Sequence, residues 1–172
     1  MSVEQKGSST HKFLRNSEMT YQDVFNYAFR WLFIPLLQNL GTRLGEDNLI
    51  AMLKEAASQV RIQGEQQAAG QVPNNDLATF TAWAREPNPF WQNTLTYEIV
   101  EDTERAFEVK VTECLWAKTF REAGNEAIGY ATVCHGDFAA CEAFNPRIKM
   151  TRTKTLMEGH ECCNHRWVWQ TD

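Results

Sequence analysis

The stretch TLTYEIVEDTERAFEVKVT, residues 94–112, decides the fold class of this chain. Apolar side chains alternate with polar ones in both halves of it, at Leu95, Tyr97 and Ile99 and then at Phe107, Val109 and Val111. A period of two is typical of a strand with one buried face. The polar link 101–105 between the two halves is short, so the stretch predicts an antiparallel hairpin.

Before this hairpin the apolar spacing is helical. We predict helices over Thr20–Leu40, Asp47–Ala69 and Asp76–Arg85. Thr20 with Asp23 three residues later suits a helix start, Pro35 should bend or restart the first helix, and Gly41 should end it. The longest apolar run, residues 31–37, is much shorter than a bilayer-spanning segment and is interpreted as a buried helical stretch.

After the hairpin, helical spacing returns over Leu115–Ala123 and Glu126–Ala143. A second hairpin is predicted from Arg147–Leu156 and Cys162–Gln170. Because a lone hairpin is barely stable in water, we expect the two hairpins to join in one sheet. The fold class is therefore α+β: a helical N-terminal half and two β-hairpins forming an antiparallel sheet covered by helices.

Composition sets the broad class. The chain has 172 residues, 43% of them hydrophobic, which suits one domain over residues 17–172 after a mobile polar arm over residues 1–16. A net charge of −5 argues against a general nucleic-acid binder. We find no export signal and no membrane-spanning run, so we expect a cytoplasmic protein with no membrane partner. Five cysteines cannot all pair, and we expect free thiols.

Cys134 and Asp137 are three residues apart on the helix predicted over Glu126–Ala143, so they share a face, while His135 points away from it. A nearby carboxylate raises a thiol's pKa, so an activated thiolate here needs a cationic or hydrogen-bonding partner. Arg152, His160 and His165 are candidates. The alternative is a buried cysteine with Asp137 capping a neighbouring group.

The last predicted strand places Cys163, His165 and Trp167 on one face and Cys162 on the other. A Cys–His pair can act as nucleophile and base, and the alternative is a cysteine packed beneath tryptophans beside an edge histidine. The cysteines and histidines could also be metal ligands, but they lack the paired spacing of metal sites. We predict no metal site and no cofactor.

Several motifs in the second half are similar to those of one known family. They are Cys114-Leu-Trp-Ala-Lys-Thr-Phe, Glu126 to Asp137 with its Cys-x-x-Asp ending, Thr151 to Gly159, and Cys163-Asn-His-Arg-Trp. Together they resemble the L-2-amino-thiazoline-4-carboxylic acid hydrolase family. Where that family closes with Cys, an acidic residue and an aromatic one, this chain has Asn164 and His165 after Cys163.

The resemblance implies a thiol-dependent hydrolase that opens a small cyclic C=N compound to an N-carbamoyl product. In that reading Cys134 or Cys163 is the nucleophile, Asp137 the acid–base and His165 an assisting base. Cys114 is a third candidate nucleophile, because it precedes a predicted helix and a helix N-terminus lowers a thiol's pKa.

Three residues are candidates for substrate binding: Arg152, His160 and Trp167. Arg152 could hold a substrate carboxylate, although an exposed strand arginine is the commoner explanation. The other functions that the sequence leaves open are a non-catalytic small-molecule-binding domain and a Cys/His metal-binding protein. We expect a small-molecule substrate as the partner and allow for a homo-oligomer.

Overall fold

The computed structural model describes residues 19–86 and 88–171. The polar arm predicted over residues 1–16 lies outside this range. Four strands form one antiparallel sheet: β1 (Leu95–Asp102), β2 (Ala106–Cys114), β3 (Ile148–Thr151) and β4 (Cys163–Trp169). Their order is β1-β2-β4-β3, so the two predicted hairpins do join, and Val109 of β2 lies opposite His165 of β4. The expected strand over Arg147–Leu156 is too long, because strand pairing stops at Thr151.

The two faces of the sheet differ in polarity, as the alternation predicts. Phe107, Val109 and Val111 of β2 are buried and belong to a core shared with the helix α8 (Asp137–Phe144) and with β3 and β4. The other face carries charged side chains, and Arg166 of β4 bonds Glu101 of β1 there, Nε to Oε2, at 2.9 Å. Within the described part of the chain, helices therefore pack on one face of the sheet only.

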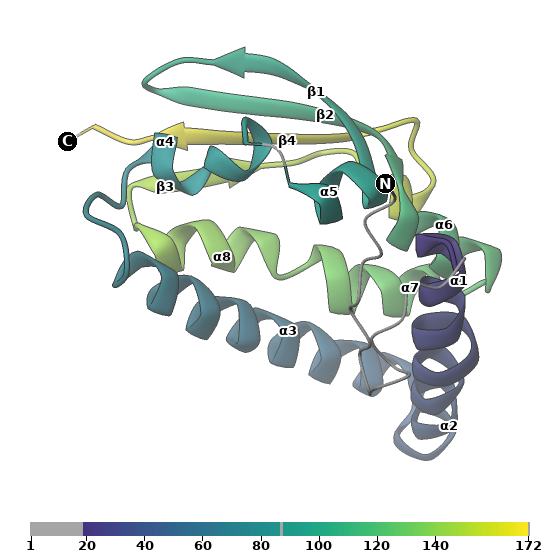
Figure 1. Cartoon of the computed structure of the whole chain (residues 1–172). Helices are drawn as coiled ribbons and strands as arrows, with labels where there is room; N and C mark the ends of the chain where they lie inside the picture. Colours follow the sequence, from purple (N-terminus) through teal and green to yellow (C-terminus); the bar gives the residue numbers. More distant parts are fainter. Residues whose placement is uncertain (1–18, 87, 172) are drawn as a thin grey trace, which may run out of the picture.

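Helices lie beneath the apolar face in two layers. Figure 1 shows α8 next to the sheet and the long helix α3 (Glu46–Ala69) beyond it. Seven shorter helical segments complete the described part of the domain after α3: α4 (Leu77–Phe80), η3 (Ala82–Ala84), α5 (Pro89–Thr94), α6 (Leu115–Glu122), α7 (Glu126–Gly129), η4 (Tyr130–Cys134) and η5 (Leu156–Glu158). The α+β prediction is confirmed.

The first predicted helix is a rod of three segments at one end of the molecule: α1 (Tyr21–Phe25), the π-helical η2 (Asn26–Phe33) and α2 (Ile34–Leu44). Thr20 and Asp23 form the expected capping box, and Pro35 lies in the first turn of α2. The expected end at Gly41 is wrong. The rod continues to Leu44, where Gly45 takes a positive φ of 82°, a backbone conformation that suits glycine.

The apolar run 31–37 in this rod does not form a buried stretch. Ile34 and Leu37 are buried, together with Phe25 earlier in the rod. Trp31 and Leu32 are exposed by 59% and 66%. The inner side chains pack in a second core with α3, α6 and α7, around Leu49, Phe120 and Ile128. The rod thus covers one end of the domain with one side and presents apolar side chains on the other.

Candidate active site

Arg152 is the centre of a polar cluster beneath the sheet. Its side chain is only 2% exposed. Nη1 donates to Oδ2 of Asp137 at 2.7 Å and lies 3.2 Å from Nε2 of His165, and Nη2 donates to the carbonyl oxygen of Cys134 at 2.9 Å. The interpretation as an exposed strand arginine is wrong. The residue directly follows β3, and its guanidinium joins helical segments to β4.

The hydrogen bonds of Arg152 also define the state of His165. A guanidinium can only donate, so Nε2 of His165 accepts and the ring carries its proton on Nδ1. Nδ1 is buried and has no partner among the described residues. The ring stacks on Trp167 at 5.7 Å between centroids. Nε2 of His165 is therefore occupied by Arg152, and a role as base at this atom would require Arg152 to turn away.

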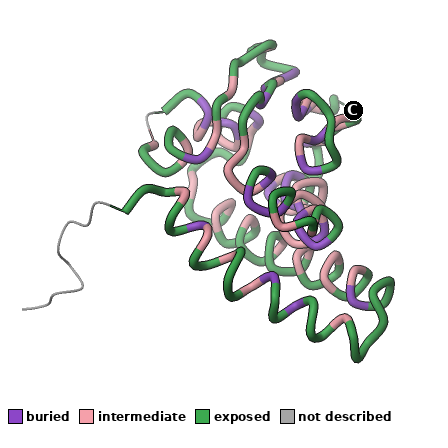
Figure 2. The backbone as a smooth tube through the Cα atoms, turned by 90° about the vertical axis from the view of Figure 1, so that its right-hand side faces the viewer, coloured by how far each residue is buried: buried purple, intermediate pink, exposed green. Residues whose placement is uncertain are grey.

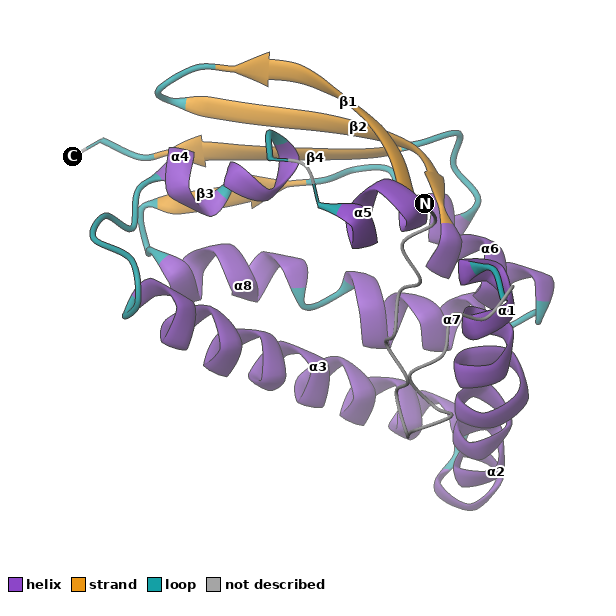
Figure 3. Ribbon diagram, in the orientation of Figure 1, coloured by secondary structure: helices purple, strands orange, loops and turns teal. Residues whose placement is uncertain are grey.

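A break in the predicted helix over Glu126–Ala143 turns Asp137 and the carbonyl of Cys134 toward Arg152. The π-helical η4 ends at Cys134, a turn follows, and α8 begins at Asp137 (Figure 3). The break lies where the segment crosses α3 closely. A Cβ on Gly136 would come within 2.7 Å of Cγ of Arg61 and 3.2 Å of the Ala57 carbonyl oxygen. The prediction of one continuous helix is wrong for this reason.

Three thiols from separate elements gather at this cluster. Cys134 ends the π-helical segment η4, Cys163 opens β4 and Cys114 ends β2. The pKa of Cys134 is raised first by burial and then by the Asp137 carboxylate, and more weakly by the other two thiols. Burial also raises the pKa of Cys114, with Asp137 adding to it, and raises that of Cys163 to about 11. All three are thus protonated at neutral pH, and any nucleophile among them must lose its proton to a base during the reaction.

Backbone amides contact two of these thiols. The amide of Ala117 donates to Sγ of Cys114 at 3.5 Å, since Cys114 is the N-cap of α6. The amide of Leu156 donates to Sγ of Cys163 at 3.2 Å. These amides favour the thiolate and oppose the effect of burial on the pKa of each thiol.

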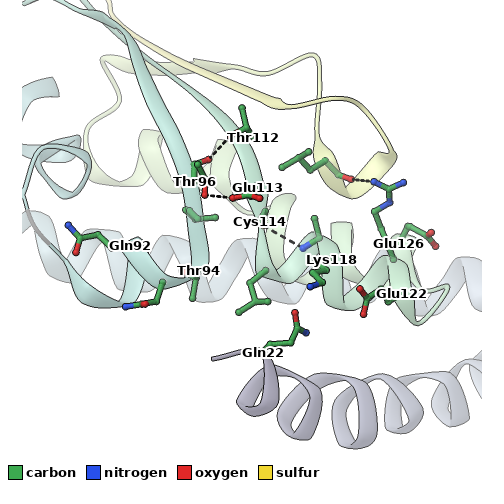
Figure 4. A pocket seen from close by; sticks show the side chains of 16 residues that line it. Gln22, Gln92, Thr94, Thr96, Thr112, Glu113, Cys114, Lys118, Glu122 and Glu126 are labelled. Atoms are coloured by element: carbon green, nitrogen blue, oxygen red, sulfur yellow. Dashed lines mark hydrogen bonds between the residues drawn. The ribbon is translucent and has the colours of Figure 1, made fainter. Parts of the chain in front are cut away.

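Cys114 also lines a pocket with a volume of about 680 Å³ (Figure 4). The pocket lies where α1, α5, the ends of β1 and β2, and α6 meet. Leu156 forms part of its wall, and the same residue's amide bonds Cys163. The pocket and the buried cluster are therefore neighbours, with Cys114 and Leu156 between them.

The pocket carries charges of both signs. Lys118 follows Cys114 by one helical turn, is exposed and has no ion-pair partner among the described residues. Glu113 lies beside Cys114 and accepts from Thr96 at 2.5 Å. Gln22 reaches the pocket from α1, and its Nε2 is buried without a partner in the described part of the chain. These groups could bind a small molecule that has both a cationic and an anionic end.

Two predicted substrate-binding residues lie away from this pocket. His160 is exposed in the turn before β4, where Nδ1 lies 3.1 Å from the carbonyl oxygen of Thr155. Trp167 is only 6% exposed and packs against Phe80 and Phe107. Nothing in the structure tests a substrate role for either, so these roles stay predictions.

Some residues of the site could not be found from spacing. Glu65 on α3 has a raised pKa, first because it is buried and also because Asp137 is near, while Arg61 acts in the opposite direction. It is 72 positions from Asp137 in the sequence, and no local pattern connects them. Lys118 could have been found, because it is one turn after Cys114 on a predicted helix. Within residues 19–86 and 88–171 no group of three or more His, Cys, Asp or Glu side chains is arranged to hold a metal ion.

The raised thiol pKa values predict a stability loss at alkaline pH. Burial favours the protonated thiol of Cys163, whose pKa rises from 9.0 to about 11 in the folded protein. Its contribution to the free energy of unfolding is therefore complete below about pH 9 and is lost as pH rises toward about 11. The shift corresponds to about 2–3 kcal/mol. In urea unfolding under reducing conditions at pH 8, 9.5 and 10.5, Cys163→Ala should lose less stability with pH than the parent chain. Equal slopes would contradict the burial effect.

Comparisons with known proteins identify the family of this chain. The family model described as L-2-amino-thiazoline-4-carboxylic acid hydrolase matches residues 24–167. None of the curated proteins matches the chain. Among solved structures, a trafficking protein particle complex subunit 3 from Naegleria fowleri, covalently bound to palmitic acid, is similar with 10% identity and a TM-score of 0.46. That match covers 80% of this chain and 92% of the other. No helix among the described residues has the length and apolar character needed to cross a bilayer.

Proposed function

We propose a specific hydrolytic reaction for this chain, which belongs to the L-2-amino-thiazoline-4-carboxylic acid hydrolase family. The substrate is a small cyclic amidine-like carboxylate, and Cys114 is the nucleophile. The observation that carries the proposal is the position of Cys114. Cys114 lines the pocket of about 680 Å³, and its thiol caps α6. Asp137 in the buried cluster is near enough to raise the pKa of this thiol.

The other two thiols are less suited to attack a ligand in this pocket. Cys134 and Cys163 are not among the residues that line it. Cys163 is 7% exposed and lies behind Leu156. For Cys134, Asp137 is the second cause of a raised pKa after burial, so ionising this thiol is especially unfavourable. Cys114 has both access to the pocket and amides that stabilise its thiolate.

The reaction uses Asp137 as the proton acceptor. As Sγ of Cys114 attacks the ring carbon between nitrogen and sulfur, the thiol proton passes to the Asp137 carboxylate. The bond from that carbon to the ring sulfur then breaks, and Asp137 returns the proton to the departing sulfur. Water adds to the carbon held on Cys114, the bond to Cys114 breaks, and its thiol is reprotonated. The product is an N-carbamoyl amino acid with a free thiol.

In this reaction Arg152 holds the carboxylate of Asp137 in place. Its three hydrogen bonds are already made to the protein, which supports a positioning role rather than capture of the substrate carboxylate. Lys118 is the better candidate for that carboxylate, because its ammonium group is unpaired in the described structure and lies in the pocket wall.

Lys118→Ala is therefore expected to raise KM about 10-fold while changing kcat little, because it removes an interaction made equally in the ground state and transition state. Steady-state kinetics with 2-amino-thiazoline-4-carboxylate measure both constants. Lys110→Ala is the matched control, since Lys110 is also exposed but pairs with Glu98 on the open face of the sheet. Equal KM changes in the two variants would remove Lys118 from the site.

The proposal as a whole is tested with the full chain, 2-amino-thiazoline-4-carboxylate and iodoacetamide. We expect ring opening, detected as the N-carbamoyl product by mass spectrometry. Alkylation should abolish it in step with modification of Cys114, and substrate should slow that modification. A chain that binds this compound without consuming it would instead be a non-catalytic binding domain, and the hydrolytic proposal would be rejected.

A further inference from the structure

A stripe of exposed apolar side chains runs along the outer side of the N-terminal rod. It has a large apolar residue at nearly every fourth position, with exposed fractions of 50% at Val24, 66% at Leu32, 55% at Leu36, 38% at Leu40 and 42% at Leu44. Ala28 fills the remaining position and is also exposed. Tyr27 and Trp31 flank the stripe, each 59% exposed. Figure 2 shows this rod exposed along most of its length.

The π-helical segment keeps the stripe straight. In a regular α-helix of 3.6 residues per turn, positions four apart drift round the axis. The wider turns of η2, Asn26–Phe33, offset this drift along the first half of the stripe. The regular turns of α2 carry the second half, where Leu36, Leu40 and Leu44 are all exposed. Phe25, Ile34 and Leu37 on the other side are buried against the domain. The rod therefore has two apolar sides, and the described residues cover only one of them.

We infer that this stripe is the interface of a symmetric dimer of the chain. The stripe is symmetric about position 34, so an antiparallel copy places Leu32 opposite Leu36, Ala28 opposite Leu40 and Val24 opposite Leu44. The same two-fold arrangement brings Asp23 at one end close to Arg43 of the copy. Arg43 is exposed and has no ion pair among the described residues. A self-complementary patch of this kind suits an isologous contact.

The charge pattern favours a second copy over a membrane or the N-terminal segment. Interfacial membrane helices are rich in lysine and arginine on the polar face. In the rod, Arg30 is instead paired with Glu122. Glu46 and Asp47 come just after the end of the rod, and the chain as a whole has a net charge of −5. Residues 1–18 contain few large apolar side chains, too few to cover a stripe about 30 Å long.

The test uses two single variants, Leu32→Lys and Leu36→Glu, with sedimentation analysis of the full chain. The parent should have twice the mass of the 19.8 kDa chain. Each variant alone should weaken the dimer by at least about 30-fold, because it places a charge against an apolar partner. An equal mixture of the two should restore the dimer, since the antiparallel arrangement pairs the lysine of one copy with the glutamate of the other.

Val60→Glu is the control, because Val60 is 68% exposed on α3, away from the stripe. It should leave the dimer unchanged. A monomeric parent at 100 µM, or single variants that remain dimeric, would overturn the inference. Failure of the mixture to recover would overturn the antiparallel register. Binding of a monomeric parent to phosphatidylcholine–phosphatidylserine vesicles would assign the stripe to a membrane instead.

Discussion

Replacing Cys114 by alanine is expected to reduce kcat/KM for 2-amino-thiazoline-4-carboxylate by roughly 10³-fold or more. The loss should lie mainly in kcat, because the pocket and Lys118 remain. The variant should stay folded, since Cys114 is only partly buried at the end of β2. Steady-state kinetics and circular dichroism measure the two properties on the same preparation.

Cys162→Ala is the matched control for this experiment. Cys162 is a buried thiol from the same region of the chain that interacts with Lys110 and Lys154. It also adds to the raised pKa of Cys163, but it does not line the pocket that Cys114 lines. Its alanine variant should keep normal activity. Full activity in Cys114→Ala, together with its loss in Cys134→Ala or Cys163→Ala, would move the nucleophile into the buried cluster.

The second large effect is expected on stability. Arg152→Met should lower the free energy of unfolding by about 2–4 kcal/mol, because it leaves the Asp137 carboxylate without its cation and the Cys134 carbonyl without its donor. Asp137 is 28% exposed, so water offsets part of the full cost of an isolated buried charge. Urea unfolding measures this difference directly.

Arg166→Met provides the comparison for the stability measurement. Arg166 also pairs with carboxylates, Glu101 and Glu108, but its side chain is 40% exposed on the open face of the sheet. Its loss should cost less than about 1 kcal/mol. Equal losses in the two variants would show that the Arg152 cluster is no more than an ordinary surface ion pair.

The sheet could be predicted from the sequence because strand alternation is local. The apolar positions of residues 94–112 predict both strands and the buried face of the first hairpin. The predicted alternation of Cys162 and Cys163 could not apply, because β4 begins at Cys163 and both thiols are buried. The break between Cys134 and Asp137 could not be predicted in this way. It accompanies the close approach of Gly136 to α3, a contact between residues almost 80 positions apart.

The sequence also does not say which apolar side of the rod is covered. Val24, Phe25, Leu32 and Leu36 all fit helical spacing, but only Phe25 is buried. Both sides of the rod are apolar, so periodicity cannot distinguish the side that packs on the domain. The importance of Cys114 likewise depends on the pocket, whose wall joins α1, α5, the strand ends and α6.

Trapping the covalent intermediate tests the central claim most directly. With enzyme in excess over 2-amino-thiazoline-4-carboxylate, the reaction is quenched in acid within one turnover, and the digested chain is mapped by mass spectrometry. The proposed reaction predicts the mass of the substrate added to the peptide that contains Cys114. Substrate mass on Cys134 or Cys163, or turnover with no modified cysteine at any quench time, would contradict it.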